Sequence, residues 1–331
     1  MLAVSSGEPF HFGSDWFDCW TAAFGDAAAV DGLRVVVGTR RIGPLRLAVL
    51  RSATNPHSVH YGLSDIAPLH DNLPNRLLAH ARVAAVELDY LPADSRLVKA
   101  AKTWCERYRV RIAPHALAPL IDTSGSYDQW FAQRSKRVRQ MLRREGEAAS
   151  AMGMRFEHST DDPTTGGLWQ RMLALEQAGW KGRERSAILD DPAATRFYTE
   201  LARRAAAAGA LQIGLMWLGE RLVAFEFGVL SAGRLFLLKV AYDEEFSAMS
   251  LGHVLASRMI RHCFQQPAIT CYDKMGNGMT PAPYKLRFAD CCAPLYRVTL
   301  YAPGPAGLAL FGYDEARART KAWRDARRVK A

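Results

Sequence analysis

The stretch from residue 210 to residue 241, ALQIGLMWLGERLVAFEFGVLSAGRLFLLKVA, is the most regular part of the chain. It contains three apolar runs, Ala210–Leu218, Arg221–Leu230 and Arg234–Ala241. Gly219-Glu220 and Ala232-Gly233 separate them, and short glycine-containing turns between apolar runs are typical of β-hairpins. The stretch therefore predicts a meander of three antiparallel strands.

Helical and extended patterns alternate on either side of this meander. Helices are predicted at 128–152, 168–178 and 196–208 before it and at 251–265 after it, with strands at 154–158, 269–274 and 295–301. Gly153 and Gly209 end two of the helices, as glycine often does. This order predicts a mixed α/β (α+β) fold with a central, mostly antiparallel sheet flanked by helices.

The first 125 residues show a weaker alternation of the same kind. A helix is predicted at 14–24, strands at 33–37, 45–50 and 83–89, and a helix at 94–108. Pro114 and Pro119 make the following run extended. Gly125 and Ser126 mark a boundary, so we predict one domain over 1–125, a second over 126–312 and a basic C-terminal helix or tail over 313–331.

The composition is that of an ordinary soluble globular protein, with 49% apolar and 23% charged residues. No apolar run approaches the ~20 residues that span a bilayer. The N-terminal sequence MLAVSSGEPFHFGSDWFDCW lacks the basic start and apolar stretch of a secretory signal, so a cytoplasmic protein is expected. The six cysteines form no CxxC pair and no Cys/His spacing that suits zinc, so no metal site is predicted.

The net charge of +10 favours polyanionic partners such as nucleic acid, anionic lipid or the phosphates of a nucleotide cofactor. Part of the excess lies in two clusters. One comprises Arg134, Lys136, Arg137, Arg139, Arg143 and Arg144, and the other Arg317, Arg319, Lys321, Arg324, Arg327, Arg328 and Lys330. A solvated helix face is the simpler explanation of each cluster.

Several short motifs follow one another between residues 126 and 301. They are the basic run 134–144 (RSKRVRQMLRR), Glu176 with Trp180-Lys181-Gly182, Phe197-Tyr198, Lys239 with Ala241-Tyr242-Asp243, Ser250–Leu255, Asp273, and Tyr284-Lys285 with Phe288. Together they resemble the GNAT superfamily of acyltransferases. Within it, they are similar to the branch related to Fem-type aminoacyltransferases and found beside exopolysaccharide and cellulose gene clusters. The resemblance implies an enzyme with tandem GNAT-like halves, of which residues 1–125 are the degenerate one.

The resemblance also implies where an acyl-CoA donor, such as acetyl-CoA, binds. The runs 221–230 and 234–241 correspond to two central strands that splay apart around the pantetheine arm. The loop and helix start that follow correspond to the pyrophosphate site, since a helix N-terminus offers unpaired N–H groups and a positive dipole end. The implied donor-binding residues are Lys239, Val240, Ser247, Ser250, Leu251, Gly252, His253 and Val254.

This loop departs from the usual family pattern of Gln or Arg, two residues, Gly, one residue, then Gly or Ala. Ser247 and Ser250 differ from it and only Gly252 matches. Two simpler interpretations stay open: Ser250 caps the helix, and His253 faces solvent on the first helical turn. Alternatively, His253 contacts a phosphate or acts as a base.

Acyl transfer to an amine needs a base, a stabilised oxyanion and a proton for the leaving group. Glu226 lies in AFEFGVL, either facing outward or buried with a raised pKa that suits a base. Asp273 ends the run ITCYD and is a candidate for contact with the acceptor and, as an alternative to Glu226, for the base. Tyr242 is a candidate acid. The resemblance implies that Lys285 assists electrostatically. The predicted substrate-binding residues are Trp180, Lys181, Asp243 and Tyr284.

Three functions follow from these observations. The first is N-acyl transfer from acyl-CoA to an amino sugar, an amino acid or a polysaccharide precursor. The second uses an aminoacyl-tRNA donor, which the basic run 134–144 and the basic tail favour. The third is a non-catalytic GNAT scaffold, because two of the three phosphate-loop signals are absent.

Overall fold

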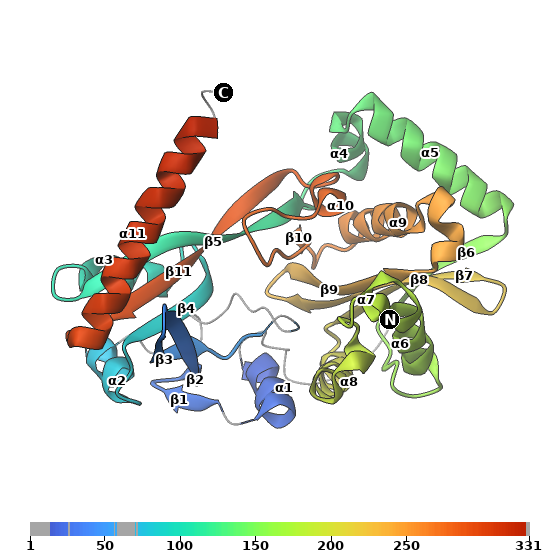
Figure 1. Cartoon of the computed structure of the whole chain (residues 1–331). Coiled ribbons are helices and arrows are strands. Elements are labelled where there is room, and N and C mark those ends of the chain that lie inside the picture. Colours follow the sequence, from blue (N-terminus) through green and yellow to red (C-terminus); the bar gives the residue numbers. More distant parts are fainter. Residues whose placement is uncertain (1–13, 26, 56, 58–69, 71, 329–331) are drawn as a thin grey trace. The chain divides into compact units, whose positions relative to one another are not determined.

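The computed structural model describes residues 14–25, 27–55, 57, 70 and 72–328 of the chain (Figure 1). The chain divides into two compact units, each assembled from segments that are distant in sequence. The first unit combines Met1–Gly25 with Leu117–Ala293, and the second combines Asp26–Ala116 with Pro294–Ala331. Residues 1–13, on which much of the expectation about a secretory signal rests, lie outside the described residues. No described helix is both long and apolar enough to cross a membrane.

The first unit is built around a sheet whose strand order is β5-β10-β9-β8-β7-β6. The meander is confirmed as β7 (Leu211–Leu218), β8 (Arg221–Ser231) and β9 (Arg234–Tyr242), with β6 (Met154–Ser159) antiparallel to β7. The short β10 (Cys271–Asp273) pairs in parallel with β9 and antiparallel with the end of β5 (Arg109–Asp122).

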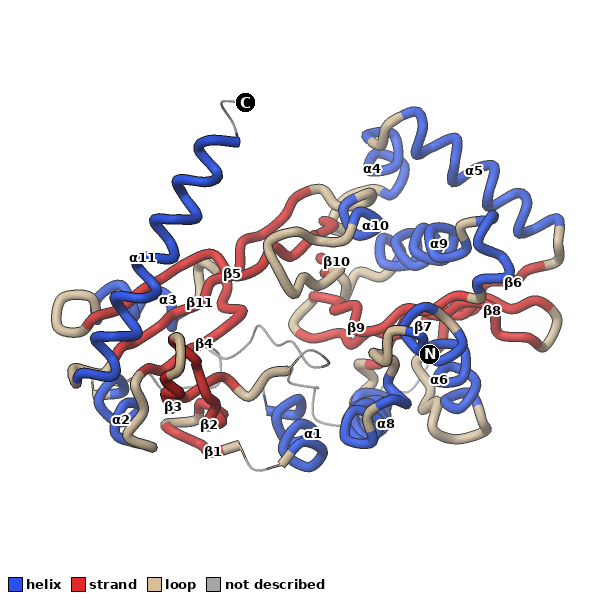
Figure 2. Tube along the Cα trace, in the orientation of Figure 1, coloured by secondary structure: helices blue, strands red, loops and turns tan. Residues whose placement is uncertain are grey.

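Helices cover both faces of this sheet (Figure 2). On one face lie α4 (Tyr127–Gln133), α5 (Lys136–Ala151) and α9 (Leu251–Gln265). On the other lie α6 (Leu168–Ala178), the short α7 (Trp180–Arg183) and α8 (Pro192–Ala207). Helix α9 buries Leu251, Val254, Leu255, Met259 and Ile260, a helical spacing that directs one apolar stripe into the core.

Helix α1 (Ser14–Phe24) packs within the first unit, although its sequence position suggested the N-terminal domain. The ring of Trp16 meets that of Phe197 on α8 edge to face, with centroids 4.9 Å apart. Both rings are buried. Aromatic burial of this size outweighs sequence proximity in deciding where a short helix docks.

The second unit has the strand order β1-β2-β3-β4-β11-β5. Its elements are β1 (Ala28–Val30), β2 (Leu33–Ile42), β3 (Leu45–Ser52), α2 (Leu73–Ala79), β4 (Ala85–Pro92), α3 (Arg96–Trp104), the first part of β5, most of β11 (Cys291–Tyr301) and α11 (Pro305–Arg328). The strands predicted at 33–37 and 45–50 lie within β2 and β3, which form an antiparallel hairpin. The predicted tail at 313–331 is, as far as the structure describes it, the later part of α11.

The two units repeat one topology. In the second unit, β1 and β2 pair antiparallel, β2 and β3 pair antiparallel, and β3 and β4 pair parallel. In the first unit, β7 and β8, β8 and β9, and β9 and β10 follow the same sequence of directions. The next neighbour in each sheet is antiparallel and comes from the other half of the chain: β11 pairs with β4, and β5 pairs with β10. The mixed α/β fold with two related halves is therefore confirmed, and the halves exchange their last strands.

The helix predicted over 128–152 is two helices in the structure. Arg134 has extended backbone angles between α4 and α5, and the Ser135 hydroxyl accepts a hydrogen bond from the Val138 N–H at 3.3 Å. Such an N-cap satisfies a helix-start N–H that otherwise has no intrahelical partner. The single-helix prediction was wrong because the apolar stripe continues across the break.

We expect Ser135→Ala to lower the free energy of unfolding by about 1 kcal/mol, the usual cost of losing an N-cap. Ser150→Ala in the same helix is the matched control, because the Ser150 hydroxyl only bonds back to the Gly146 carbonyl. Urea denaturation of both variants measures the difference. An equal loss in the two would show that the hydroxyl of Ser135 is not a cap.

Candidate active site

A pocket of about 410 Å³ lies in the first unit, where β9 and β10 separate. The two strands pair only over Arg234–Phe236 and Cys271–Asp273, whereas β9 continues to Tyr242. The pocket is lined from β9 by Val240, Ala241 and Tyr242, and from beyond β10 by Lys274. Its volume is within the range that small ligands and their reactive ends occupy.

The expected separation between the runs 221–230 and 234–241 was wrong. Strands β8 and β9 pair from Ala224 opposite Tyr242 to Ser231 opposite Arg234, with one irregularity near Phe227. The tight turn at Ala232-Gly233 joins them, and apart from that irregularity they stay paired along their length. The strands that diverge are instead β9 and β10.

Glu226 is a buried carboxylate inside this pocket, only 2% exposed. One of its oxygens accepts a 2.6 Å hydrogen bond from the Tyr272 hydroxyl, and the other accepts from Lys274 Nζ at 3.1 Å. Burial and the adjacent carboxylate raise the pKa of Tyr272 well above its usual value, so the phenol stays a donor. The outward-facing alternative for Glu226 was wrong.

Lys274 is a site residue that the sequence analysis missed. Its side chain is 1% exposed, lines the pocket and lies with Nζ 4.5 Å from the centre of the Tyr272 ring. The available signal was a lysine directly after the apolar strand that Asp273 ends. Its burial depends on Glu226, which is 48 residues earlier in the sequence.

His253, on the first turn of α9, also lines the pocket and is half-buried, so the solvent-facing interpretation was wrong. Its Nδ1 is buried and has no hydrogen-bond partner. Burial, together with the charges of Arg287 and Lys274, lowers the pKa of His253 below its usual value. A neutral imidazole has one nitrogen that accepts a proton, which is the form expected near pH 7.

The segment before α9 forms one edge of the pocket, with Ser247, Ser250 and Gly252 among its lining residues. Ser250 is the N-cap residue of α9 and has left-handed backbone angles (φ 49°), but its hydroxyl makes no capping hydrogen bond. Helix α9 begins at Leu251, and the N–H groups of its first turn lie at this edge.

Glu176 and Lys181, which line the pocket, form a connected charged group with Lys239. Lys181 Nζ donates to Glu176 at 2.7 Å and to the Val240 carbonyl at 2.8 Å. Lys239 Nζ lies 3.9 Å from the same carboxylate and 4.7 Å from the Tyr198 ring centre. Burial lowers the pKa of Lys239 to about 8. Burial alone would raise the pKa of Glu176, but the two lysines hold it below its usual value.

Asp273 and Lys285 converge on the backbone of Met275. Asp273 is fully buried and accepts the Met275 N–H at 2.7 Å, while Lys285 Nζ donates to the Met275 carbonyl at 2.8 Å. Burial raises the pKa of Asp273 to about 6, and burial with the nearby Lys274 lowers that of Lys285 to about 8. The two side chains therefore hold the segment that carries Lys274.

The structure brings most of the predicted residues to the pocket. Its lining includes Glu226, Tyr242, Val240, Ser247, Ser250, Gly252, His253, Trp180, Lys181 and Tyr284. Six others are not among the lining residues: Lys285, Asp273, Lys239, Leu251, Val254 and Asp243. Leu251 and Val254 are core residues, and Asp243 caps the turn Glu244–Met249 and pairs with Arg221. Among the described residues, no three His, Cys, Asp or Glu side chains gather as metal ligands.

Comparison with known proteins gives a family for the part of the chain that contains this pocket. Residues 135–286 match the family model described as an acetyltransferase (GNAT) domain. No curated protein matches the chain.

Solved structures resemble the chain over about nine-tenths of its length. FemX does so with a TM-score of 0.53, 12% identity and coverage of 91% of this chain and 93% of its own. The C-terminal domain of a putative lysylphosphatidylglycerol synthetase from Agrobacterium fabrum has a TM-score of 0.52 and 10% identity, and the match covers 91% of this chain and 96% of that domain. The L-PGS structure from Bacillus licheniformis has a TM-score of 0.52 and 11% identity, and the match covers 93% of this chain and 97% of its own. At these identities the likeness is one of fold. Residues 135–286, a little under half of the chain, match a GNAT acetyltransferase domain, and this match supports an acyltransferase.

Proposed function

We propose that the first unit transfers an acyl group, acetyl being the simplest, from acyl-CoA to an amine. The pocket where β9 leaves β10 carries this proposal. There the free edge of β9 offers backbone groups to an extended ligand, and the first turn of α9 offers N–H groups to its phosphates. The pocket accommodates the thioester end of such a donor, with Ser247 and Ser250 supplying hydroxyls in place of the usual Gln/Arg and Gly.

The pocket residues suit the bond changes of this reaction. The amine attacks the thioester carbonyl, the C–N bond forms, and the C–S bond breaks once the oxyanion collapses. His253 accepts the proton from the amine because its side chain lines the pocket and its lowered pKa favours the neutral imidazole. The Lys274 ammonium stabilises the oxyanion, and the Tyr242 or Tyr284 hydroxyl protonates the leaving thiolate.

Glu226, Asp273 and Lys285 then act as positioning residues in this mechanism. Hydrogen bonds from Tyr272 and Lys274 occupy one oxygen each of the Glu226 carboxylate, so Glu226 anchors the Lys274 side chain and does not face the amine. Asp273 and Lys285 fix the Met275 peptide beside Lys274.

The acceptor side of the pocket has two exposed aromatic rings. Trp180 is 45% exposed and Tyr284 is 40% exposed, and both line the pocket. Exposed rings of this kind stack on sugar faces. We therefore propose an amino sugar or a similar polysaccharide precursor as the acceptor, which agrees with the exopolysaccharide and cellulose branch that the sequence resembles.

A second candidate donor is aminoacyl-tRNA. Lys136, Arg137, Arg143 and Arg144 are exposed on α5, where they are available to phosphate groups. The fold likeness to FemX and to lysylphosphatidylglycerol synthetase domains favours the same alternative. The family model, which names an acetyltransferase, favours acyl-CoA.

Titration calorimetry of the full chain distinguishes the two donors. We expect heat with acetyl-CoA or a longer acyl-CoA, and a melting temperature that rises with ligand concentration. The absence of heat at millimolar acyl-CoA, together with salt-dependent binding of charged tRNA, would replace the first candidate by the second. Absence of binding and transfer with both donors would overturn both.

We expect Gly252→Val to raise the KM for the acyl donor about tenfold, about 1.4 kcal/mol, with little change in kcat. A Cβ at this position would lie 3.5 Å from the Tyr242 ring, an ordinary contact, so the fold tolerates it while the added methyl groups narrow the pocket. The control is Gly146→Val, a helical glycine in α5 with open space around its Cβ position. Steady-state kinetics of both variants is the measurement, and an equal rise in KM would contradict the assignment.

A further inference from the structure

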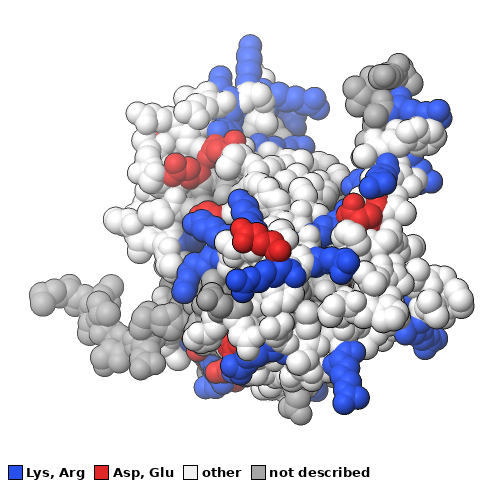
Figure 3. All heavy atoms as spheres, turned by 90° about the vertical axis from the view of Figure 1, so that its left-hand side faces the viewer, with Lys and Arg blue, Asp and Glu red and all other residues white. Residues whose placement is uncertain are grey.

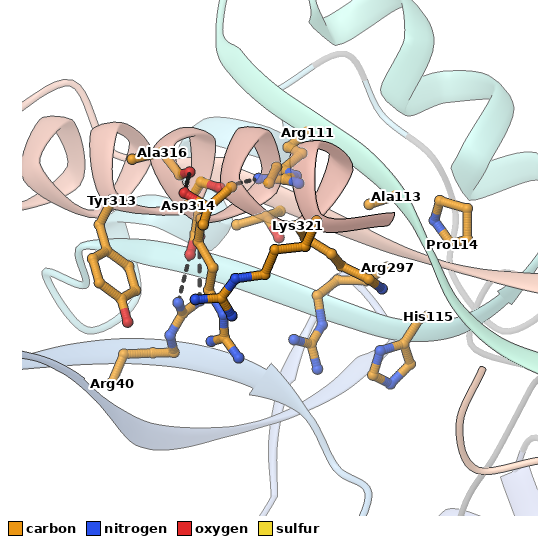
Figure 4. A pocket seen from close by; sticks show the side chains of 15 residues that line it. Arg40, Arg111, Ala113, Pro114, His115, Arg297, Tyr313, Asp314, Ala316 and Lys321 are labelled. Carbon is orange, nitrogen blue, oxygen red and sulfur yellow. Dashed lines mark hydrogen bonds and ion pairs between the residues drawn. The ribbon is translucent and has the colours of Figure 1, made fainter. Parts of the chain in front are cut away.

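The second unit has its own pocket, of about 910 Å³, formed by α11 together with β2, β5 and β11 (Figure 4). Six of its lining residues are cations, Arg40, Arg111, Arg297, Arg317, Lys321 and Arg324. Asp314 is the one carboxylate among the lining residues. The face shown in Figure 3 likewise has many more lysine and arginine side chains than acidic ones. A cavity with this imbalance attracts anions.

Three of the six cations are held in place by the protein. Arg40 bridges Glu87 and Asp314, at 2.6 Å to each, and Arg297 binds both carboxylate oxygens of Asp89. Arg111 donates to the Asp314 carbonyl at 2.7 Å. Figure 4 shows the bonds from Arg40 and Arg111 to Asp314 on α11. These contacts fix the guanidinium groups while leaving some of their N–H donors unused.

The other three cations all lie on α11. Arg317, Lys321 and Arg324 follow one another at helical spacing and therefore lie on one face of α11, along with Tyr313. In the described part of the chain, none of the three forms an ion pair or a hydrogen bond. Like charges at this spacing repel each other, so a helix face of this kind gains stability when an anion binds to it.

We propose that this pocket binds an anionic ligand with at least two phosphate groups, held between the three free cations of α11 and the fixed Arg111 and Arg297. Arginine side chains bind phosphate oxygens through two parallel N–H donors. Arg317 and Arg324 are seven residues apart, roughly 10 Å along the helix. A ligand with several phosphates can therefore contact more of this row of cations at once than a single phosphate does. The proposal is independent of the acyl-donor pocket, because the two share no residue.

Calorimetry of the full chain with tripolyphosphate, pyrophosphate and inorganic phosphate tests this proposal. We expect affinity to fall in that order and to fall with added salt. The test variant is Arg317→Gln/Arg324→Gln, and the matched control is Arg319→Gln/Arg327→Gln. Both remove two exposed arginines from α11, but Arg319 and Arg327 do not line the pocket. We expect at least a tenfold loss of tripolyphosphate affinity in the first and less than a twofold loss in the second.

Equal losses in the two double variants would indicate diffuse attraction to a basic helix and would overturn the proposal, as would unchanged affinity in both. Gly252→Val should bind tripolyphosphate like the unmodified chain, and a tenfold loss there would place the anion in the acyl-donor pocket instead. Two further experiments measure binding to other polyanions. One compares vesicles of phosphatidic acid with vesicles of phosphatidylcholine, and the other uses a short RNA duplex. Binding of vesicles or RNA without binding of tripolyphosphate would also overturn it, in favour of a membrane or nucleic-acid surface.

Discussion

Lys274→Met should lower the free energy of unfolding of the first unit by about 3–5 kcal/mol and reduce acyl transfer by a factor of about 100 to 1,000. The variant leaves the Glu226 carboxylate in a site that is 2% exposed, with the Tyr272 hydroxyl as its remaining hydrogen-bond partner. Removing one member of a buried ion pair costs this much because the charge that stays behind is neither paired nor hydrated. Loss of activity follows from losing the cation beside the oxyanion.

A second substitution separates the two effects. In Glu226→Gln/Lys274→Met the buried site is neutral, so most of the stability should return, while activity should stay low because no ammonium is present. Lys285→Met is the control, since Lys285 Nζ donates to a backbone carbonyl and is not paired with Glu226. Urea denaturation and initial rates measure the two quantities. The assignment is wrong if Lys274→Met is no less stable than Lys285→Met, or if the double variant is active.

The sequence predicted the fold most reliably where local patterns decide the structure. The meander from β7 to β9 was predicted because its two glycine-containing turns and apolar runs are local signals. The exchange of β5 and β11 was not, because both are extended segments whose sequence does not reveal their partner. The break at Ser135 was missed because an N-cap serine inside a continuous apolar stripe looks like an ordinary exposed helix residue.

Only part of the pocket was predicted, again because only local patterns are visible in the sequence. Glu226 stood out as a carboxylate within an apolar run, and the resemblance to GNAT enzymes pointed to Gly252 and its neighbours. Lys274 and Tyr272 were missed because they become site residues only when β10 lies beside β9, and that parallel pairing spans just three residues of each strand. A pairing so short leaves no periodic signal. This short pairing also explains why the separation was predicted between the strands that are β8 and β9, although it lies between β9 and β10.

Asp273 should make the first unit less stable at neutral pH than in mild acid. Burial raises its pKa to about 6 from the ordinary 3.8, and this outweighs the nearby Arg234 and Lys285, which act to lower it. The folded chain therefore holds this proton more tightly than the unfolded chain. The resulting stabilisation is complete below pH 3.8 and is lost as the pH rises through about 6. A difference of roughly two pKa units corresponds to about 3 kcal/mol.

Asp273→Asn should remove this dependence, because an amide stays neutral at every pH and its oxygen can still accept the Met275 N–H. Relative to the unmodified chain, the variant should gain about 3 kcal/mol between pH 4 and pH 7 in urea denaturation. Asp122→Asn, on the neighbouring strand β5, is a control of opposite sign. Hydrogen bonds from Ser124 lower the pKa of Asp122, so the unmodified chain gains stability from this group as the pH rises over the acid range. Relative to the unmodified chain, Asp122→Asn should therefore lose stability over that range, not gain it. A common trend in both variants would mean that the burial of Asp273 does not control its proton, and that its role in holding the Met275 segment must be assigned differently.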